Sequence, residues 1–425
     1  MPEKRPQPSR GNIALRIVRL MGPGVITGAA DDDPSGIATY SIAGAQLGTR
    51  LLWTSFLTWP LMAAVQMMCA RIGMVTGEGL ASGLRRKLPR WICVAFVIAL
   101  AVANTINVGA DLSGMADAAE LLFGWNSHLF VIGFGIVIAV VTVKFRYHQI
   151  SRVLLWLVPS LGAYVVTAVI SRPGWTSVLH DALVPHWPAG RDEWGTIVAI
   201  LGTTISPYLF FWQTAQEVEE EKAKGRRMLV KRYGATKNEI VNRRIDVGLG
   251  TFFSNVVMFF VILCCATTLH THGVTQITTT KEAAEALRPL AGPAATLLYT
   301  FGLIGVGCLA IPTLAGSAAY AFAETFDWRE GLDKPYAGAR EFYIVLVISI
   351  ACGIVMNFLH LSPIRMLYWT AIINGLLSPF LLVGIYLVAT DRVLMRKQPS
   401  SVASRILVLA TIVAMFGAGA ALFVV

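Results

Sequence analysis

The sequence predicts an all-helical protein that crosses a membrane about eleven times. Of its 425 residues, 55% are hydrophobic and 14% are charged, whereas a soluble domain carries about 25% charged residues. The apolar residues gather in runs long enough to cross a bilayer, for which about 20 helical residues suffice. Two of these runs, five spans apart, are interrupted by proline and polar residues. That pairing is typical of two inverted five-helix repeats.

The apolar runs are separated by charged loops, and these loops divide the chain. We predict a cytoplasmic tail (1–12), a first repeat (13–170), an outside loop (171–193), a second, inverted repeat (194–389), and a cytoplasmic loop with an eleventh helix (390–425). The predicted spans are 14–47, 51–72, 91–113, 128–143, 153–170, 194–217, 246–269, 292–322, 342–359, 366–389 and 406–425.

The net charge of +10 has an uneven distribution along the chain. If the N-terminus is cytoplasmic, 29 of the 35 Lys and Arg residues fall in inside segments and 6 in outside segments. Cytoplasmic loops of membrane proteins carry such an excess of basic residues. The charge therefore predicts a multi-pass protein of the cell (inner) membrane, with its N-terminus cytoplasmic and its C-terminus outside. It gives no support for nucleic-acid binding.

Three consecutive acids, Asp31, Asp32 and Asp33, interrupt the first span and are followed by Pro34 and Gly36. An acid at mid-membrane costs roughly 2.5–3.5 kcal/mol on insertion scales, so it usually faces a cavity or a partner. Proline removes a backbone donor and glycine relaxes the dihedral angles, so the helix is expected to break here. A break frees carbonyl oxygens beside the carboxylates, and a hard cation prefers oxygen ligands.

The sixth span contains Thr203 and Ser206 just before Pro207. A simple proline kink is common in membrane helices and explains this span taken alone. Together with the interrupted first span, however, it indicates a transporter site between two broken helices.

Other spans carry polar residues on one helical face. In the third span, Asn104, Asn107 and Asp111 form such a stripe; hydrogen bonding between helices is an equally open reading for the two asparagines, whereas Asp111 is a candidate proton carrier. The tenth span places Asn374 in a similar stripe. The stretch 217–244 is predicted to be an interfacial amphipathic segment with no chemistry of its own. No Ser/His/Asp set, zinc motif or phosphate-binding glycine loop is present, so an enzyme is not expected.

Several of these motifs resemble one known family. Residues 22–24 and Asp33–Gly36 are similar to the first helix of the NRAMP family of divalent-metal transporters, whose motif there is DPGN. Residues 204–208 line up with the family's sixth-helix MPH motif, and 314–324 is similar to its eighth helix. The resemblance covers nearly the whole chain. It implies a LeuT-type fold with the ion between the broken first and sixth helices, and it makes Asp33 the carboxylate ligand.

The sequence departs from the family motifs at several positions. The motif asparagine is Gly36 here, the methionine is Ser206 and the histidine is Tyr208. The third-helix acid is retained as Asp111, but a second acid three residues later is Gly114. The resemblance and the residues together give a metal site and a proton pathway or polar lining. The expected metal-site residues are Asp33, Asp32, Ala30, Gly36, Thr203 and Ser206, and the expected lining residues are Asp111, Asn107, Tyr208 and Asn374.

The expected function is secondary-active transport of a divalent metal cation, with protons as a second candidate ion and no cofactor. Because the site is rich in oxygen, we expect a weakened preference for manganese and iron, and uptake of magnesium. The alternative is transport of an organic cation or an amino acid on the same fold. The sequence leaves open the oligomeric state, and whether Asp31 or Asp32 faces the site.

Overall fold

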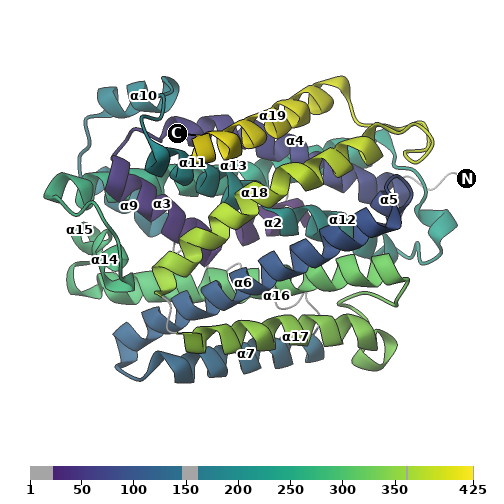
Figure 1. The fold of residues 1–425 in the computed structure, drawn as a ribbon, viewed down its shortest axis with the longest axis horizontal. Coiled ribbons are helices and arrows are strands. Elements are labelled where there is room, and N and C mark those ends of the chain that lie inside the picture. Colours follow the sequence, from purple (N-terminus) through teal and green to yellow (C-terminus); the bar gives the residue numbers. More distant parts are fainter. Residues whose placement is uncertain (1–22, 146–160, 360–361, 425) are drawn as a thin grey trace, which may run out of the picture.

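The computed structural model describes residues 23–145, 161–359 and 362–424, and these contain helices and no strand. The predicted tail at 1–12 and part of the fifth span, 153–160, lie outside the described residues. The longer helices run roughly parallel in one bundle (Figure 1). They are α2 (Pro23–Asp31), α3 (Pro34–Leu47), α4 (Trp53–Thr76), α6 (Arg90–Phe123), α7 (Ser127–Lys144), α9 (Gly162–Ile170), α11 (Arg191–Thr204), α12 (Pro207–Ala223), α13 (Lys237–Thr268), α16 (Ala295–Phe326), α17 (Arg340–Met356), α18 (Pro363–Thr390) and α19 (Val402–Val424).

Short helices fill the connections at the two ends of this bundle. The α-helical ones are α5 (Leu80–Arg85), α10 (Trp175–Leu183), α14 (Thr280–Glu285) and α15 (Arg288–Ala291). Single 3₁₀ turns occur at Leu229–Arg232, His270–His272, Gly292–Ala294, Tyr336–Gly338 and Asn357–Leu359. The segments 77–89, 224–236, 327–339 and 391–401 gather at one end, which we call the α5 end, and α10, α14 and α15 lie at the other (Figure 1).

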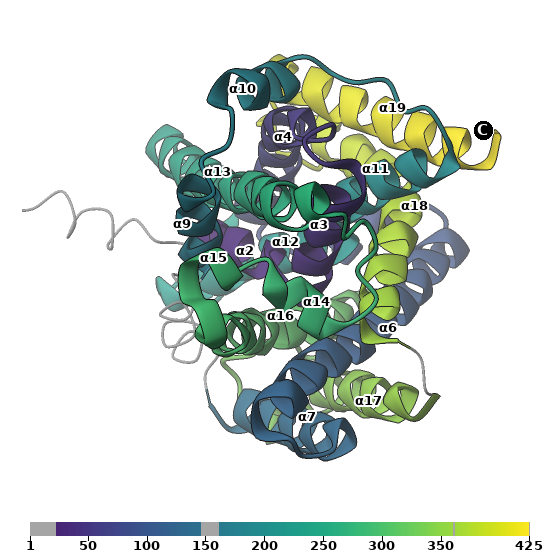
Figure 2. The same ribbon diagram turned by 90° about the vertical axis from the view of Figure 1, so that its left-hand side faces the viewer.

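The broken helices occupy the centre of the bundle. In the most apolar part of residues 191–223, 94% of residues are buried, against 22% in α7. Helices α4, α13 and α19 lie on one side of this centre, and α6, α16, α7 and α17 on the other (Figure 2). A transport site at the breaks is therefore enclosed by helices on all sides.

Eight of the described helical segments are long and apolar enough to cross a membrane. They correspond to the predicted third, fourth and sixth to eleventh spans. Two helix ends differ from the prediction by nine residues or more. Helix α6 runs to Phe123, ten residues beyond the predicted end, and stops only where Gly124 adopts φ 72°. Helix α13 begins at Lys237, nine residues early, because Thr236 and Glu239 form a capping box.

Glycines allow the first half of each broken helix to approach a neighbour closely. A Cβ on Gly28 of α2 would lie 2.4 Å from the carbonyl oxygen of Gly250 in α13. A Cβ on Gly202 of α11 would lie 2.0 Å from the Ala371 carbonyl oxygen of α18. Only glycine fits at such contacts, since backbones this close leave no room for a side chain. These two contacts fix where the breaks sit in the bundle.

The prediction of an interfacial segment at 217–244 is wrong. Helix α12 continues to Ala223, and both Glu217 and Arg243 are buried. The Arg243 guanidinium forms ion pairs with Glu217, Glu220 and Asp246. Asp246 also accepts hydrogen bonds from the first backbone N–H groups of α2, at 2.8 Å from Gly24 and 3.3 Å from Val25. Charge periodicity alone did not reveal this, because the partners lie on three different helices.

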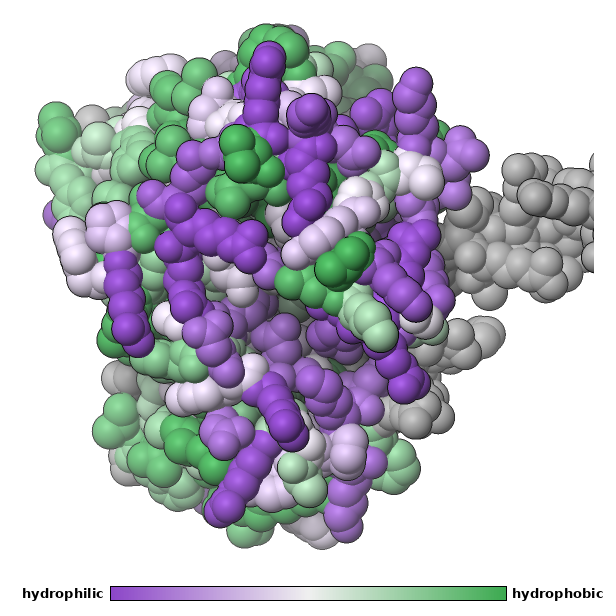
Figure 3. Space-filling view, turned by 90° about the vertical axis from the view of Figure 1, so that its right-hand side faces the viewer, coloured by the Kyte–Doolittle hydropathy of each residue, from purple (hydrophilic) through white to green (hydrophobic). Residues whose placement is uncertain are grey.

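The α5 end is dense in polar side chains (Figure 3). Glu324, at the end of α16, accepts hydrogen bonds from the backbone N–H groups of Ala81 and Ser82 and so holds α5 in place. Beside it, two hydrogen bonds from Arg85 hold the pKa of Asp327 below its ordinary value. Glu324, the last residue of the stretch 314–324 that the sequence singled out, therefore has structural partners in α5.

Candidate functional site

The first break lies between Asp31 and Pro34, as predicted. Asp33 caps the N-terminus of α3: its Oδ1 accepts a 2.7 Å hydrogen bond from the Gly36 N–H, and Pro34 occupies the first helical position. Its Oδ2 accepts a 3.2 Å hydrogen bond from Nδ2 of Asn107 in α6. The side chain is 2% exposed. Asp33 thus links the break to the third predicted span.

The second break lies between Thr204 and Pro207, also as predicted. Proline again begins the second half, because its missing N–H costs nothing at that position. The Ser206 hydroxyl lies 2.7 Å from the carbonyl oxygens of both Gly202 and Thr203 and donates to them. The Thr203 carbonyl at the break therefore already accepts one hydrogen bond.

One side chain joins the two breaks. The hydroxyl of Tyr208 in α12 donates a 2.8 Å hydrogen bond to the carbonyl oxygen of Ala30 in α2. Both residues are fully buried. A carbonyl oxygen has two lone pairs, so Ala30 retains one acceptor position for a cation.

The two acids before the break face α13. The Ser254 hydroxyl lies 2.6 Å from Oδ2 of Asp31 and 3.2 Å from Oδ1 of Asp32. The other carboxylate oxygen of each aspartate is buried and has no hydrogen-bond partner among the described residues. No sequence pattern selects Ser254, since a lone serine in an apolar span usually bonds to its own helix.

The predicted stripe on α6 divides between two neighbours. Asn107 contacts Asp33, whereas Nδ2 of Asn104 donates to Ser317 and to the Leu314 carbonyl of α16. Asp111 is buried near Asp33 and the Ser35 backbone, and neither of its carboxylate oxygens has a hydrogen-bond partner within residues 23–145, 161–359 and 362–424. The structural reading therefore holds for Asn104, while Asn107 and Asp111 face the break.

Helix α18 contacts both breaks. The Ser35 hydroxyl donates to the Leu367 carbonyl at 2.8 Å, and the Ser378 hydroxyl donates to the Ile205 carbonyl at 2.7 Å. Asn374 lies between these contacts along the helix and is buried, with no partner for its Oδ1 in the described part of the chain. The polar stripe predicted for the tenth span, which contains Asn374, was the sequence signal for these contacts.

Gly36 packs closely against the second broken helix. A Cβ at this position would lie 3.0 Å from Oγ1 of Thr203. The space that the family's asparagine would need is therefore partly filled. Gly36 and Thr203 are brought together as the sequence predicted, across the two breaks.

Charge is the main feature of the assembled site. Asp31, Asp32, Asp33 and Asp111 are all at most 2% exposed, and none forms an ion pair with Lys or Arg in the described residues. No three His, Cys, Asp or Glu side chains among those residues converge on one point. The site therefore offers several separate carboxylates with carbonyl, hydroxyl and amide oxygens. Burying such charges is costly unless a cation or protons compensate them.

Comparison with known proteins identifies the family. The model of the Nramp family, described as natural resistance-associated macrophage protein-like, matches residues 24–425. The chain belongs to the Nramp family. The resemblance found in the helix-break motifs is thereby confirmed.

Curated relatives of this Nramp chain carry one name. Proteins called divalent metal cation transporter MntH match it at 28% identity in Aeromonas hydrophila, over 70% of this chain and 72% of theirs, and in Yersinia pestis, over 70% and 71%. These relatives are named as transporters, in agreement with the expectation that the chain is not an enzyme.

Solved structures agree in fold. A manganese transporter of Eremococcus coleocola superposes with a TM-score of 0.73 at 16% identity, covering 97% of this chain and 87% of that one. Mhp1, a nucleobase-cation-symport-1 family transporter, superposes with a TM-score of 0.59 at 15% identity, covering 91% and 80%. The predicted LeuT-type fold is confirmed, and the chain is an integral membrane protein.

Proposed function

We propose that this chain is a secondary-active transporter of divalent metal cations in the cell membrane, with its α5 end in the cytoplasm. The observation that carries the proposal is the set of buried aspartates at the first helix break, which lack any basic partner among the described residues. A transported cation supplies the missing positive charge. The names of the MntH relatives and of the E. coleocola manganese transporter support the same cargo class.

Asp33 is the central ligand in this proposal. Its carboxylate lies at the break and accepts a hydrogen bond from the Asn107 amide, and the Ala30 carbonyl belongs to the half-helix on the other side of the same break. Asp32, Thr203 and Ser206 complete the proposed set of oxygen ligands. Gly36, which has no side chain, lets the first broken helix lie close to Thr203. Because all of these residues are buried, the cation reaches them only when the half-helices move, which is the behaviour expected of alternating access.

The proposed selectivity follows from the donors. Ser206 and Tyr208 supply hydroxyls where the family motif has a thioether and an imidazole. Magnesium and calcium prefer oxygen ligands, whereas soft or nitrogen donors favour transition metals. We therefore propose that manganese transport is accompanied by magnesium transport.

Proton coupling is proposed to be weak or absent. Tyrosine has an unperturbed pKa near 10 and does not cycle protons as a histidine near 6.5 does. Asp111 is the remaining candidate carrier. Acidification of the lumen during metal uptake, abolished by Asp111→Asn, would contradict this proposal.

The test is uptake by the purified chain in proteoliposomes. Manganese, magnesium, calcium, an organic cation and a panel of amino acids are offered separately and in competition. Uptake of manganese that is absent from protein-free liposomes is the expected result. Uptake of an organic solute without any divalent cation would overturn the proposal.

A further inference from the structure

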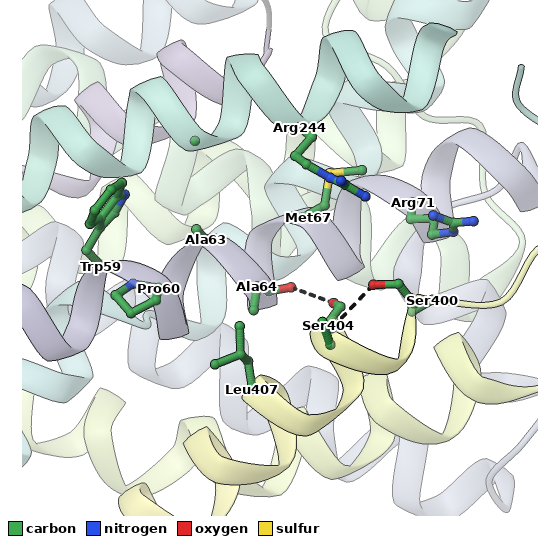
Figure 4. A pocket seen from close by; sticks show the side chains of 13 residues that line it. Trp59, Pro60, Ala63, Ala64, Met67, Arg71, Arg244, Ser400, Ser404 and Leu407 are labelled. Carbon is green, nitrogen blue, oxygen red and sulfur yellow. Dashed lines mark hydrogen bonds between the residues drawn. The ribbon is translucent and has the colours of Figure 1, made fainter. Parts of the chain in front are cut away.

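An apolar groove with a basic end runs along the surface between α4, α13 and α19. Its volume is about 350 Å³. The apolar walls include Trp59, Pro60, Ala63, Met67 and Leu407 (Figure 4). None of the residues that line it is acidic. From Trp59 to Arg71 the groove follows twelve residues of α4, about 18 Å at the helical rise, which is close to the depth of one leaflet of a bilayer.

Three arginines meet at the α5 end of the groove. Arg71 and Arg244 line it (Figure 4). Arg405, in the first turn of α19, lies close enough to Arg71 for the two guanidinium groups to repel each other, as Arg244 and Arg71 also do. Arg71 uses its Nε to reach the Gln398 carbonyl at 3.0 Å, and Arg405 uses its Nε to reach the Ser400 carbonyl at 2.8 Å. Among the described residues, none of the three has an acidic partner.

The neighbouring residue Arg243 differs from these three arginines, because it does have acidic partners. Arg243 is buried against Glu217, Glu220 and Asp246, whereas Arg244 is exposed and points toward the groove. Three like charges without a counter-ion repel one another, unless an anion from outside the protein binds between them. Charge complementarity therefore calls for an anionic ligand at this end.

A buried polar atom at the same place supports this reading. Ser400 lines the groove and is 3% exposed, and its Oγ has no hydrogen-bond partner in the part of the chain that the structure describes. Helix α19 begins two residues later, and its first turn contributes Ala403 and Ser404 to the lining; the N–H groups of a first helical turn lack partners within the helix, although that of Ser404 is bonded to the Ser401 hydroxyl. A phosphate oxygen satisfies both kinds of donor.

We propose that this groove binds an anionic phospholipid, with its phosphate among Arg71, Arg244 and Arg405 and an acyl chain along the wall from Met67 to Trp59. The apolar length requires a chain as well as a headgroup, which distinguishes a lipid from free phosphate. Exposed Phe252 and Leu249 of α13 continue the apolar surface beside the groove, as a lipid-facing wall does. The inference does not depend on the transported ion.

The test measures lipid binding to the full chain in detergent, by native mass spectrometry. Phosphatidylglycerol and phosphatidylcholine with identical acyl chains are compared, and inorganic phosphate is the headgroup-only probe. Basic residues near a membrane surface attract anionic lipid, so we expect phosphatidylglycerol to bind at least about tenfold more tightly. Arg71→Gln with Arg244→Gln should abolish this preference.

Matched variants make the result decisive. Arg329→Gln with Arg340→Gln removes the same charge from exposed arginines elsewhere at the α5 end and should leave the preference intact. Arg244→Gln alone changes one exposed side chain, so it reports on the site even where the double variant is unstable. Ala63→Phe fills the apolar wall, keeps all three arginines, and should also weaken phosphatidylglycerol binding.

Three results would overturn the proposal. Equal binding of the two lipids would remove the role of charge. Loss of the preference in the Arg329 and Arg340 variant as well would show a general charge effect. Competition by millimolar inorganic phosphate, with Ala63→Phe unaffected, would assign the site to a free anion.

Discussion

The two helix breaks have the same backbone arrangement but differ in how their polar groups find hydrogen-bond partners. In each, a capping residue precedes a proline that begins the second half-helix. At the second break, Ser206 and Ser378 bind the carbonyls that the break releases. At the first, Asp33 and its acidic neighbours are buried and have no basic partners among the described residues. The carbonyls of the second break are therefore bonded within the protein, whereas the carboxylates of the first call for a cation.

The largest expected effect comes from removing charge at the first break. Asp33→Asn keeps a good helix cap, since asparagine caps nearly as well as aspartate, but it removes the anionic ligand. Manganese uptake in proteoliposomes should fall to the level of protein-free liposomes, and Asp33→Ala should behave alike. Unchanged melting temperature for Asp33→Asn is the control for folding. Uptake at the wild-type rate would show that the charge at this break is not the ion's ligand.

Selectivity should change when the second break acquires a soft donor. Ser206→Met replaces a hydroxyl with a thioether, which favours manganese over magnesium. Excess magnesium should therefore inhibit manganese uptake less in this variant than in the wild type. Ser206→Ala also releases the Gly202 and Thr203 carbonyls but adds no sulfur, so it serves as the control. Identical competition curves for all three proteins would contradict the softness argument.

A smaller effect is expected from the bond that joins the breaks. Tyr208→Phe removes the hydrogen bond to the Ala30 carbonyl, which is worth about 1 kcal/mol. That corresponds to a change of about fivefold in the apparent affinity for manganese. Concentration-dependent uptake measures it. An effect as large as that of Asp33→Asn would mean that the hydroxyl itself is a principal ligand.

The smallest effect on transport is expected from a hydrogen bond that serves stability alone. Ser378→Ala leaves the buried Ile205 carbonyl without its partner, at a cost of about 1–3 kcal/mol. The matched control is Thr204→Val, because among the described residues the Thr204 hydroxyl bonds only to the Ile200 carbonyl of its own helix. Melting temperature should fall for Ser378→Ala and change little for Thr204→Val, with transport retained in both. Equal melting temperatures would show that the second break does not need α18.

The positions of the breaks were determined by the sequence itself. A proline next to polar residues within an apolar run is a local signal, and it marked both Asp33-Pro34 and Ser206-Pro207 before any packing was known. Length and hydropathy determined the helical class in the same way. Helix ends were predicted less well: Gly124 ends α6 ten residues late, because an apolar run does not show where a polar helix continues beyond it.

The partners across the site were decided only by the tertiary structure. Asn104 and Asn107 lie on one face of α6. Asn104 nevertheless contacts α16, whereas Asn107 contacts Asp33 at the first break. Ser254 with Asp31, and Tyr208 with Ala30, are pairs separated by 223 and 178 residues. Periodicity assigns a side chain to a face of its own helix. Which helix lies against that face depends on how all the helices pack, as the glycine contacts of α2 and α11 show.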